Sequence, residues 1–244
     1  MIYVVLGMHK SGTSLVSELL HRSGVRMVDV DAEPGDYDAG AFYERADVRE
    51  LNCEILGFGD PAYLHPKPAA LRLRDDLRVR MRAILQRCEA AGGDWGFKDP
   101  RTCLTYPLWR EELGAHRIVA VTRSLGEVLS HYRKREPKWL LTWRTVRTWC
   151  DYNEGMLRAL QAQESEALLL SYEALMTSQE ELERLERFVG RKIADVRSPS
   201  HYRSQGGFRL STAAVVALRA LAGQSRPAAI TRGLDALREE QRRP

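Results

Sequence analysis

The sequence predicts an α/β domain of three layers, in which helices flank a central parallel β-sheet. Four short apolar segments suited to buried strands alternate with stretches of helical periodicity. Consecutive parallel strands need long crossover connections, and helices usually supply them. A chain of 244 residues can bury one sizeable core, and no segment has the composition of a linker. We therefore expect residues 1–244 to form a single domain.

The predicted strands are continuous apolar runs, as strands buried on both faces require. They span residues 2–6, 95–97, 118–121 and 167–170. The first run contains two β-branched valines and an isoleucine, and it ends at Gly7. The sheet is therefore expected to be buried on both sides.

Apolar residues at helical spacing predict five helices. The first begins at Thr13 and ends near Gly24, and the others cover residues 46–56, 71–91, 138–163 and 178–189. Ser178 followed by Glu181 matches a capping box at the start of the last helix. The tryptophans between residues 138 and 163 are expected to pack in the core. Residues 29–40, rich in Asp, Pro and Gly, predict an exposed loop.

The composition favours a soluble globular chain. Hydrophobic residues make up 44% and charged residues 29%, and no apolar run approaches the roughly 18 residues of a membrane helix. Residues 1–6 have neither a basic leader nor a cleavage site, which predicts a cytoplasmic protein. The net charge of +4 suits an anionic ligand. Because the basic residues are dispersed and form no stripe, we expect no nucleic-acid partner.

The cysteines predict a reducing environment and no metal centre. Cys53, Cys88, Cys103 and Cys150 are scattered, with no C-x-x-C pair and no histidine at metal-ligand spacing. Reduced, mostly buried thiols are the expectation for such a chain.

Residues 7–14, Gly-Met-His-Lys-Ser-Gly-Thr-Ser, lie between the first predicted strand and the first predicted helix. Loop amides and the helix N-terminus converge on an anion in such a unit. The two glycines and Ser14 match the P-loop pattern G-x-x-x-x-G-K-[ST]. Thr13, however, stands where the nucleotide hydrolases have their lysine, and Lys10 stands three residues earlier. The segment is therefore P-loop-like, but its chemistry differs.

A nucleotide hydrolase uses the loop lysine together with Mg²⁺, which is usually held by an Asp that ends an apolar strand. The third and fourth predicted strands run instead into Thr122-Arg123 and Ser171-Tyr172. A transferred sulfuryl group carries less charge than a phosphoryl group, so amides and one lysine could stabilise the leaving phosphate without a metal. These residues favour a sulfate donor over ATP.

The run Lys10-Ser11-Gly12-Thr13-Ser14 resembles the 5′-phosphosulfate loop of PAPS-dependent sulfotransferases, where PAPS is 3′-phosphoadenosine 5′-phosphosulfate. Three later segments follow in the order expected of bacterial members: Lys98-Asp99-Pro100-Arg101, residues 119–132 and residues 171–175. The resemblance spans about residues 2–190. It implies a P-loop-like fold and sulfuryl transfer from PAPS to a hydroxyl or amine, with adenosine 3′,5′-bisphosphate as the second product.

The resemblance also implies which residues hold PAPS. Lys10, Ser11, Gly12, Thr13 and Ser14 correspond to the 5′-phosphosulfate loop, Arg123 and Ser130 to the 3′-phosphate site, Tyr172 to the adenine site, and Arg203 to a late loop that closes on the 3′-phosphate. In the family the serine usually follows the arginine by eight residues. Here Ser130 is at seven and His131 at eight, so either can take that role. The usual Arg-Lys-Gly pattern around Arg203 is absent. A strand-end salt bridge is the alternative for Arg123, and core packing is the alternative for Tyr172.

Three residues are the candidates for catalysis. Lys98 ends the second predicted strand, and Lys10 lies in the loop, so both can meet charge that develops on the transferred group. Glu44 follows the acidic loop and is the candidate general base, with His9, His131 and Asp99 as rivals. Asp99 and Arg101 are alternatively expected to form an ion pair.

Two other functions are compatible with the sequence. One is a small-molecule kinase with a divergent P-loop, and the other is a catalytically silent nucleotide-binding module. The acceptor is open among carbohydrate, lipid, natural product and peptide. We expect residues 29–43 and 61–68 and the tryptophan-bearing helix to select it.

Overall fold

The structure is a computed structural model that describes residues 1–29, 43–57, 67–135, 139–162, 164–198 and 226–243. Its centre is a parallel sheet with the strand order β2-β1-β3-β4. The strands are β1 (Ile2–Leu6), β2 (Trp95–Lys98), β3 (His116–Thr122) and β4 (Glu166–Ser171). All four predicted strands are confirmed, and β3 begins two residues before the predicted start.

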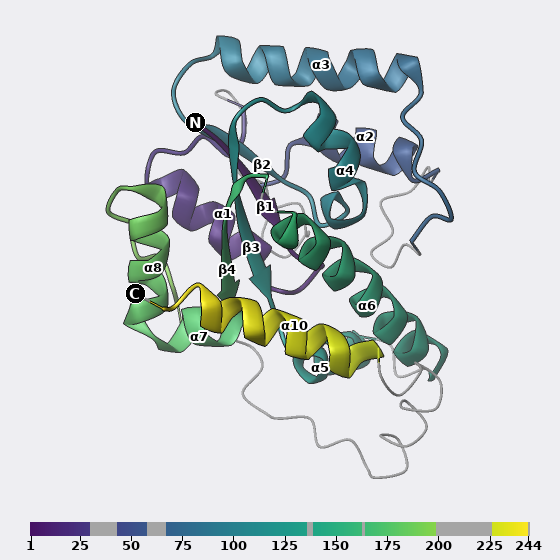
Figure 1. Ribbon diagram of the computed structural model, residues 1–244, viewed down its shortest axis with the longest axis vertical. Helices are drawn as coiled ribbons and strands as arrows, with labels where there is room; N and C mark the ends of the chain where they lie inside the picture. Colours follow the sequence, from purple (N-terminus) through teal and green to yellow (C-terminus); the bar gives the residue numbers. More distant parts are fainter. Residues whose placement is uncertain (30–42, 58–66, 136–138, 163, 199–225, 244) are drawn as a thin grey trace.

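Helices cover the sheet on both sides (Figure 1). Within the described residues they are α1 (Thr13–Arg22), α2 (Ala46–Ile55), α3 (Asp75–Ala90), α4 (Thr102–Glu112), α5 (Leu125–Arg135), α6 (Trp139–Gln161), α7 (Tyr172–Thr177), α8 (Gln179–Val189) and α10 (Arg226–Glu240). The five predicted helices are present, although α3 begins four residues after the predicted start. The helix α5 follows β3, as the resemblance over residues 119–132 implied, whereas the helices α4, α7 and α10 were not predicted.

Alternate residues of each strand face opposite layers. Val4 and Leu6 of β1 point into a core shared with α2, α3, α4, α6 and α10. Tyr3 and Val5 point into a second core, which contains residues of α1, α7 and α8. Because two apolar cores lie on opposite faces of one sheet, the predicted three-layer α/β architecture is confirmed.

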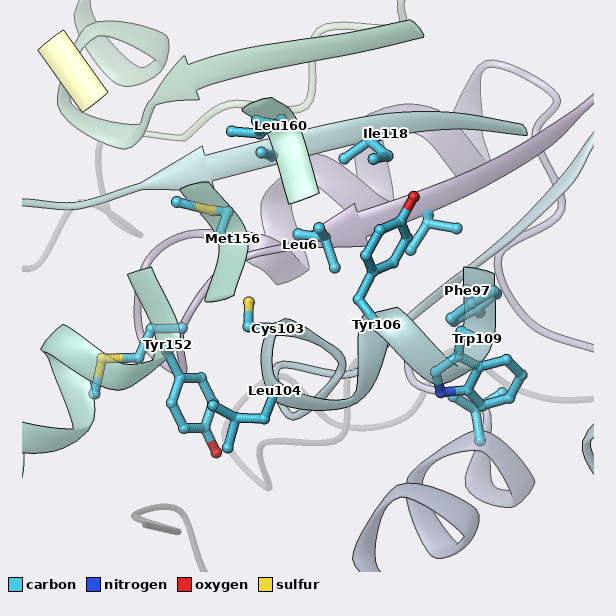
Figure 2. Packing of buried hydrophobic residues seen from close by; sticks show 14 of the residues in the cluster. Leu6, Phe97, Cys103, Leu104, Tyr106, Trp109, Ile118, Tyr152, Met156 and Leu160 are labelled. Carbon is cyan, nitrogen blue, oxygen red and sulfur yellow. The ribbon is translucent and has the colours of Figure 1, made fainter. Parts of the chain in front are cut away.

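In the first core, α4 and α6 approach each other closely. Pro107 lies inside α4 and has no backbone N–H to donate to the carbonyl of Cys103, one turn earlier. Gly155 of α6 packs on this carbonyl, and a Cβ atom added there would lie 2.1 Å from the oxygen. Figure 2 shows Cys103 of α4 in the same cluster as Leu6 of β1 and Met156 of α6. Proline and glycine together allow this contact between the two helices.

The outer edge of β4 is covered by side chains. The amide of Gln241 donates to the carbonyl of Ala167 and accepts from the N–H of Leu169, at 3.0 and 2.9 Å. Arg184 of α8 donates to the carbonyl of Leu169 at 3.4 Å. These bonds replace those that another strand would make with this edge.

Glu181 completes the cover of β4 and corrects the predicted capping box. Its buried carboxylate accepts the N–H of Ser171 at 3.0 Å and also contacts Arg184 and Arg242. Ser178 is the N-cap residue of α8, as predicted, but its side chain makes no capping hydrogen bond. The glutamate does not reach back to the cap because it is committed to the strand edge and the two arginines.

The four cysteine thiols and Trp149 lie in the buried part of the structure. All four cysteines are buried and none forms a disulfide, as predicted. Trp149 is buried, and its indole N–H donates to the carbonyl of Arg123 at 3.1 Å. None of the described helices is long and apolar enough to cross a membrane.

Candidate functional site

The phosphate loop joins β1 to α1, as predicted. Lys10 and Gly12 have positive φ angles of 67° and 94°, and the N–H of Ser11 donates to the carbonyl of Met8 at 3.1 Å. No side chain caps α1, whose N-cap residue is Gly12. The first amides of a helix have no partner within it, so they remain available to an anion beyond the N-terminus.

Ser11 provides independent evidence for a ligand at this loop. Its residue is only 1% exposed, and its hydroxyl has no hydrogen-bond partner among the described residues. A buried hydroxyl without a partner is costly, whereas an anion in the loop could accept a hydrogen bond from it. The loop therefore fits a phosphate or sulfate group.

Two glycines give the loop its close contacts. A Cβ atom on Gly7 would lie 2.6 Å from the carbonyl oxygen of Val121 in β3. A Cβ atom on Gly12 would lie 2.1 Å from Cδ2 of the Tyr172 ring. Only glycine fits at either position, and at Gly12 the positive φ adds to the requirement.

Arg123 supports the loop from the end of β3. Its Nη1 donates to the carbonyl of Lys10 at 2.9 Å, and its guanidinium stacks 4.7 Å from the centre of the Tyr172 ring. Nη2 lies 3.5 Å from Oε2 of Glu127, which is a long contact. Both Arg123 and Tyr172 are buried. The structure thus brings both residues against the phosphate loop, and their predicted contacts with PAPS remain a proposal.

Lys98 and Glu44 form a buried ion pair beside the loop. Nζ of Lys98 is 2.7 Å from Oε1 of Glu44 and 3.4 Å from Oγ of Ser14. The two charged side chains are 1% and 5% exposed. The lysine and the candidate base, predicted from segments 54 residues apart, therefore meet at the last serine of the loop.

Asp99 and Arg101 form the expected ion pair directly behind Lys98. Arg101 Nη1 donates to Oδ1 of Asp99 at 2.7 Å, and both side chains are buried. Burial raises the pKa of Asp99, Arg101 opposes this rise, and the nearby Glu44 adds to it. The pair makes Asp99 a structural partner of Arg101 in this arrangement.

The other predicted site residues lie on α5, near Tyr152 or outside the described part of the chain. Ser130 and His131 lie on α5 and are partly buried, and the structure gives no contact between Ser130 and Arg123 among the described side chains. His9 is buried, with its ring 6.0 Å from that of Tyr152. Arg203 lies outside the described residues. Within the described chain, no group of three or more His, Cys, Asp or Glu side chains could hold a metal ion.

Three residues beneath the site were missed by the sequence analysis. Cys103 accepts the N–H of Gly7 at 3.2 Å, and burial raises the pKa of its thiol to about 12. Tyr152 is fully buried, and burial raises its pKa well above the usual value. Asn52 contacts Asp99 at 2.8 Å. Their contacts depend on packing between α2, α4 and α6, for which periodicity gives no signal beyond a buried face.

No protein-family model matches the chain, and no curated protein matches its sequence. Solved structures do match. The sulfotransferase domain from the curacin biosynthetic pathway aligns over 96% of this chain and 97% of its own, with a TM-score of 0.52 and 14% identity. The sulfotransferase domain from the Synechococcus PCC 7002 olefin synthase aligns over 100% and 94%, with a TM-score of 0.52 and 15% identity. The chain therefore has the P-loop-like α/β fold of these sulfotransferase domains.

Proposed function

We propose that the protein is a sulfotransferase that transfers the sulfuryl group of PAPS to a hydroxyl or amine of an acceptor. The observation that carries the proposal is the buried Lys98–Glu44 pair at Ser14 of the phosphate loop. A cation and a carboxylate beside the loop support the proposed charge stabilisation and proton removal. Two of its structural neighbours are sulfotransferase domains, which supports the proposal.

The loop supplies the donor site. The amides at the start of α1 and the hydroxyl of Ser11 hold the 5′-phosphosulfate, together with Lys10, Thr13 and Ser14. Arg123 and Ser130 or His131 are proposed for the 3′-phosphate, and Tyr172 for the adenine. PAPS supplies an activated sulfuryl group on a phosphate leaving group.

The ion pair supplies the chemistry. Glu44 takes the proton of the acceptor as a new bond forms between the acceptor oxygen or nitrogen and sulfur. The bond between sulfur and the bridging phosphate oxygen breaks, and its electron pair leaves with adenosine 3′,5′-bisphosphate. Lys98 and Lys10 stabilise the charge that develops on the bridging and sulfuryl oxygens. In this scheme Lys98 turns from Glu44 toward the donor, which frees the carboxylate to act as the base.

A thermal-shift comparison tests the donor. We expect adenosine 3′,5′-bisphosphate to raise the melting temperature, because a ligand that binds the folded state stabilises it. ATP with Mg²⁺ should give the smaller shift. The opposite ranking would contradict the proposal and favour a kinase with a divergent P-loop.

A transfer assay tests the reaction. Sulfur-labelled PAPS is incubated with separate pools of carbohydrate, lipid, phenolic natural product and peptide acceptors, and products are resolved by chromatography. A labelled product that depends on the protein supports the proposal and identifies the acceptor class. Bisphosphate binding with no labelled product from any pool would instead favour a catalytically silent module.

A further inference from the structure

Asn52 is a polar residue at the centre of the interface between α2 and α4. Its side chain is fully buried. Nδ2 donates to Oδ2 of Asp99 at 2.8 Å and to Oγ1 of Thr102 at 3.0 Å. Oδ1 accepts from Oγ1 of Thr105 at 2.7 Å and from Nε1 of Trp109 at 2.8 Å. A side-chain amide has two N–H donors and two acceptor lone pairs, so all four are used.

The position of Asn52 links the two chain segments that carry the ion pair. Glu44 lies two residues before the start of α2, and Asp99 directly follows Lys98. Asn52 joins α2 to Asp99 near the far end of that helix. At its beginning, Arg45 donates to the carbonyl of Gly96 in β2 at 3.1 Å. Two buried attachments therefore fix α2 against the end of β2, where Lys98 meets Glu44.

The chemistry at this position requires an amide. Asp99 is fully buried, with Oδ1 on Arg101 and Oδ2 on Asn52. A carboxylate at position 52 would set two buried acidic groups against each other, and one proton would have to be shared between them. An apolar residue would leave Asp99 Oδ2 without this donor, at the cost of an unsatisfied buried charge.

We propose that Asn52 is a positioning residue for the Lys98–Glu44 pair, acting through Asp99 and α2. This inference rests on the proposed function, in which Glu44 removes the proton of the acceptor and Lys98 stabilises the developing charge. The hydrogen bonds of Asn52 go to Asp99, Thr102, Thr105 and Trp109, so it acts on Lys98 and Glu44 only through other residues.

The test is Asn52→Asp, which keeps the shape of the side chain and removes both N–H donors. Thr105→Val is the matched control. It removes the hydroxyl that donates to Oδ1 of Asn52 at 2.7 Å and lies 3.5 Å from the carbonyl oxygen of Arg101, and it leaves the donor of Asn52 to Asp99 in place. Both variants should lose stability. The melting temperature therefore does not distinguish a residue that positions the Lys98–Glu44 pair from one that only stabilises the core.

The readout is the side-chain NH₃⁺ signal of Lys98 in ¹H–¹⁵N spectra, assigned by its loss in Lys98→Met. A lysine held in a buried ion pair exchanges its protons slowly with water. In Asn52→Asp we expect the signal to shift or to exchange about tenfold faster, the equivalent of one net hydrogen bond. In Thr105→Val it should stay in place.

A calorimetric titration with adenosine 3′,5′-bisphosphate accompanies the spectra. If the wild-type chain does not bind the bisphosphate, the proposed function fails, while the spectra still decide the role of Asn52. A folded Asn52→Asp variant with an unchanged Lys98 signal overturns the inference. If that variant does not fold, Asn52→Ser, which replaces the two N–H donors of the amide by one shorter hydroxyl donor, takes its place under the same criterion.

Discussion

At the scale of single residues, Lys10 combines an unusual backbone with a charge in the loop. Its φ of 67° lies in the left-handed region that non-glycine residues adopt infrequently. Its carbonyl is held by Arg123. Strained residues that the surroundings hold in place cluster at functional sites. This supports the proposed role of Lys10 at the phosphosulfate.

Lys10→Ala is expected to lower the turnover number by about 10²-fold, as removal of a charge-stabilising donor does elsewhere. The measurement is steady-state transfer from labelled PAPS, with Lys192→Ala as the control. The Lys192 side chain is 92% exposed and should be dispensable. Near-normal turnover in Lys10→Ala would remove this lysine from the mechanism.

Glu44→Gln is expected to lower the rate of transfer by at least about 10²-fold, because an amide cannot take the proton of the acceptor substrate. Binding of adenosine 3′,5′-bisphosphate should stay within about threefold, a change below 1 kcal/mol. Calorimetry measures the binding and the labelled assay measures the transfer. Unchanged transfer would assign the base to His9, His131 or Asp99.

At the scale of elements, the contact between α4 and α6 depends on Gly155. The helix α6 also carries Trp149, which donates to the carbonyl of Arg123. Any shift of α6 away from α4 therefore acts on the end of β3, beside the phosphate loop. The indole of Trp149 and the amide of Asn153, which accepts from Oγ1 of Thr122 at 3.3 Å, connect the packing of α6 with the geometry of the site.

Gly155→Ala should destabilise the protein by about 1–3 kcal/mol. Alanine favours a helix over glycine by about 1 kcal/mol, but here its Cβ would lie 2.1 Å from the carbonyl oxygen of Cys103. Gly126→Ala in α5 is the control, because none of the described atoms lies within 4 Å of the added Cβ. Urea unfolding should give a lower free energy of unfolding for Gly155→Ala. For Gly126→Ala the free energy of unfolding should be higher than that of the wild type, or unchanged. A stabilised Gly155→Ala would contradict the described contact.

At the scale of the whole molecule, Glu181 joins three parts of the chain. Its carboxylate binds the end of β4 through Ser171, its own helix through Arg184, and the residues after α10 through Arg242. Burial favours the neutral acid, but the hydrogen bonds from these three groups outweigh it and lower the pKa.

The depressed pKa of Glu181 gives a pH dependence of stability. An unfolded glutamate titrates near 4.3, so the contribution is complete above that pH and is lost as the pH falls through the lower folded value. Glu181→Gln should reduce the free energy of unfolding by about 3 kcal/mol at pH 7 and pH 5, since it leaves the buried guanidinium of Arg184 without its carboxylate. The difference from wild type should narrow below about pH 4.

Urea unfolding at several pH values measures this difference. Glu183→Gln, at an exposed position of the same helix, is the control and should change little at any pH. A deficit of Glu181→Gln that stays constant down to the acid limit would show that Glu181 is not the titrating group.

The sequence predicted the sheet and the loop because these depend on local patterns. Continuous apolar runs identify buried strands, and Gly7, Gly12 and Ser14 follow a strand at a recognisable spacing. The helix α4 was missed because Pro107 in its interior is normally a helix breaker. In the structure Gly155 of α6 packs on the carbonyl of Cys103 that Pro107 leaves without a donor. Gly155 and Cys103 are 52 positions apart, so no local sequence window contains this contact.

For the candidate site, the sequence predicted individual residues but not the contacts between them. Lys98 and Glu44 could be selected as residues, but their 2.7 Å pairing depends on how α2 sits against β2. Asn52 gave no signal, because an asparagine on a predicted helix is usually exposed. The positions of Arg123 and Tyr172 followed from strand ends, whereas their stacking on each other required the three-dimensional arrangement.

The amide of Gln241 is chemically a peptide group, and it stands at the edge of β4 where the peptide group of a further strand would stand. The C-terminal residues thus occupy a position that any extended polypeptide could otherwise use to continue the sheet. Gln241→Ala should leave this position open and produce concentration-dependent self-association, measured by analytical ultracentrifugation. Gln161→Ala, at the exposed end of α6, should remain unchanged in size. The side chain of Gln241 would then act with Arg184 and Glu181 to keep the edge of β4 from pairing with a second molecule.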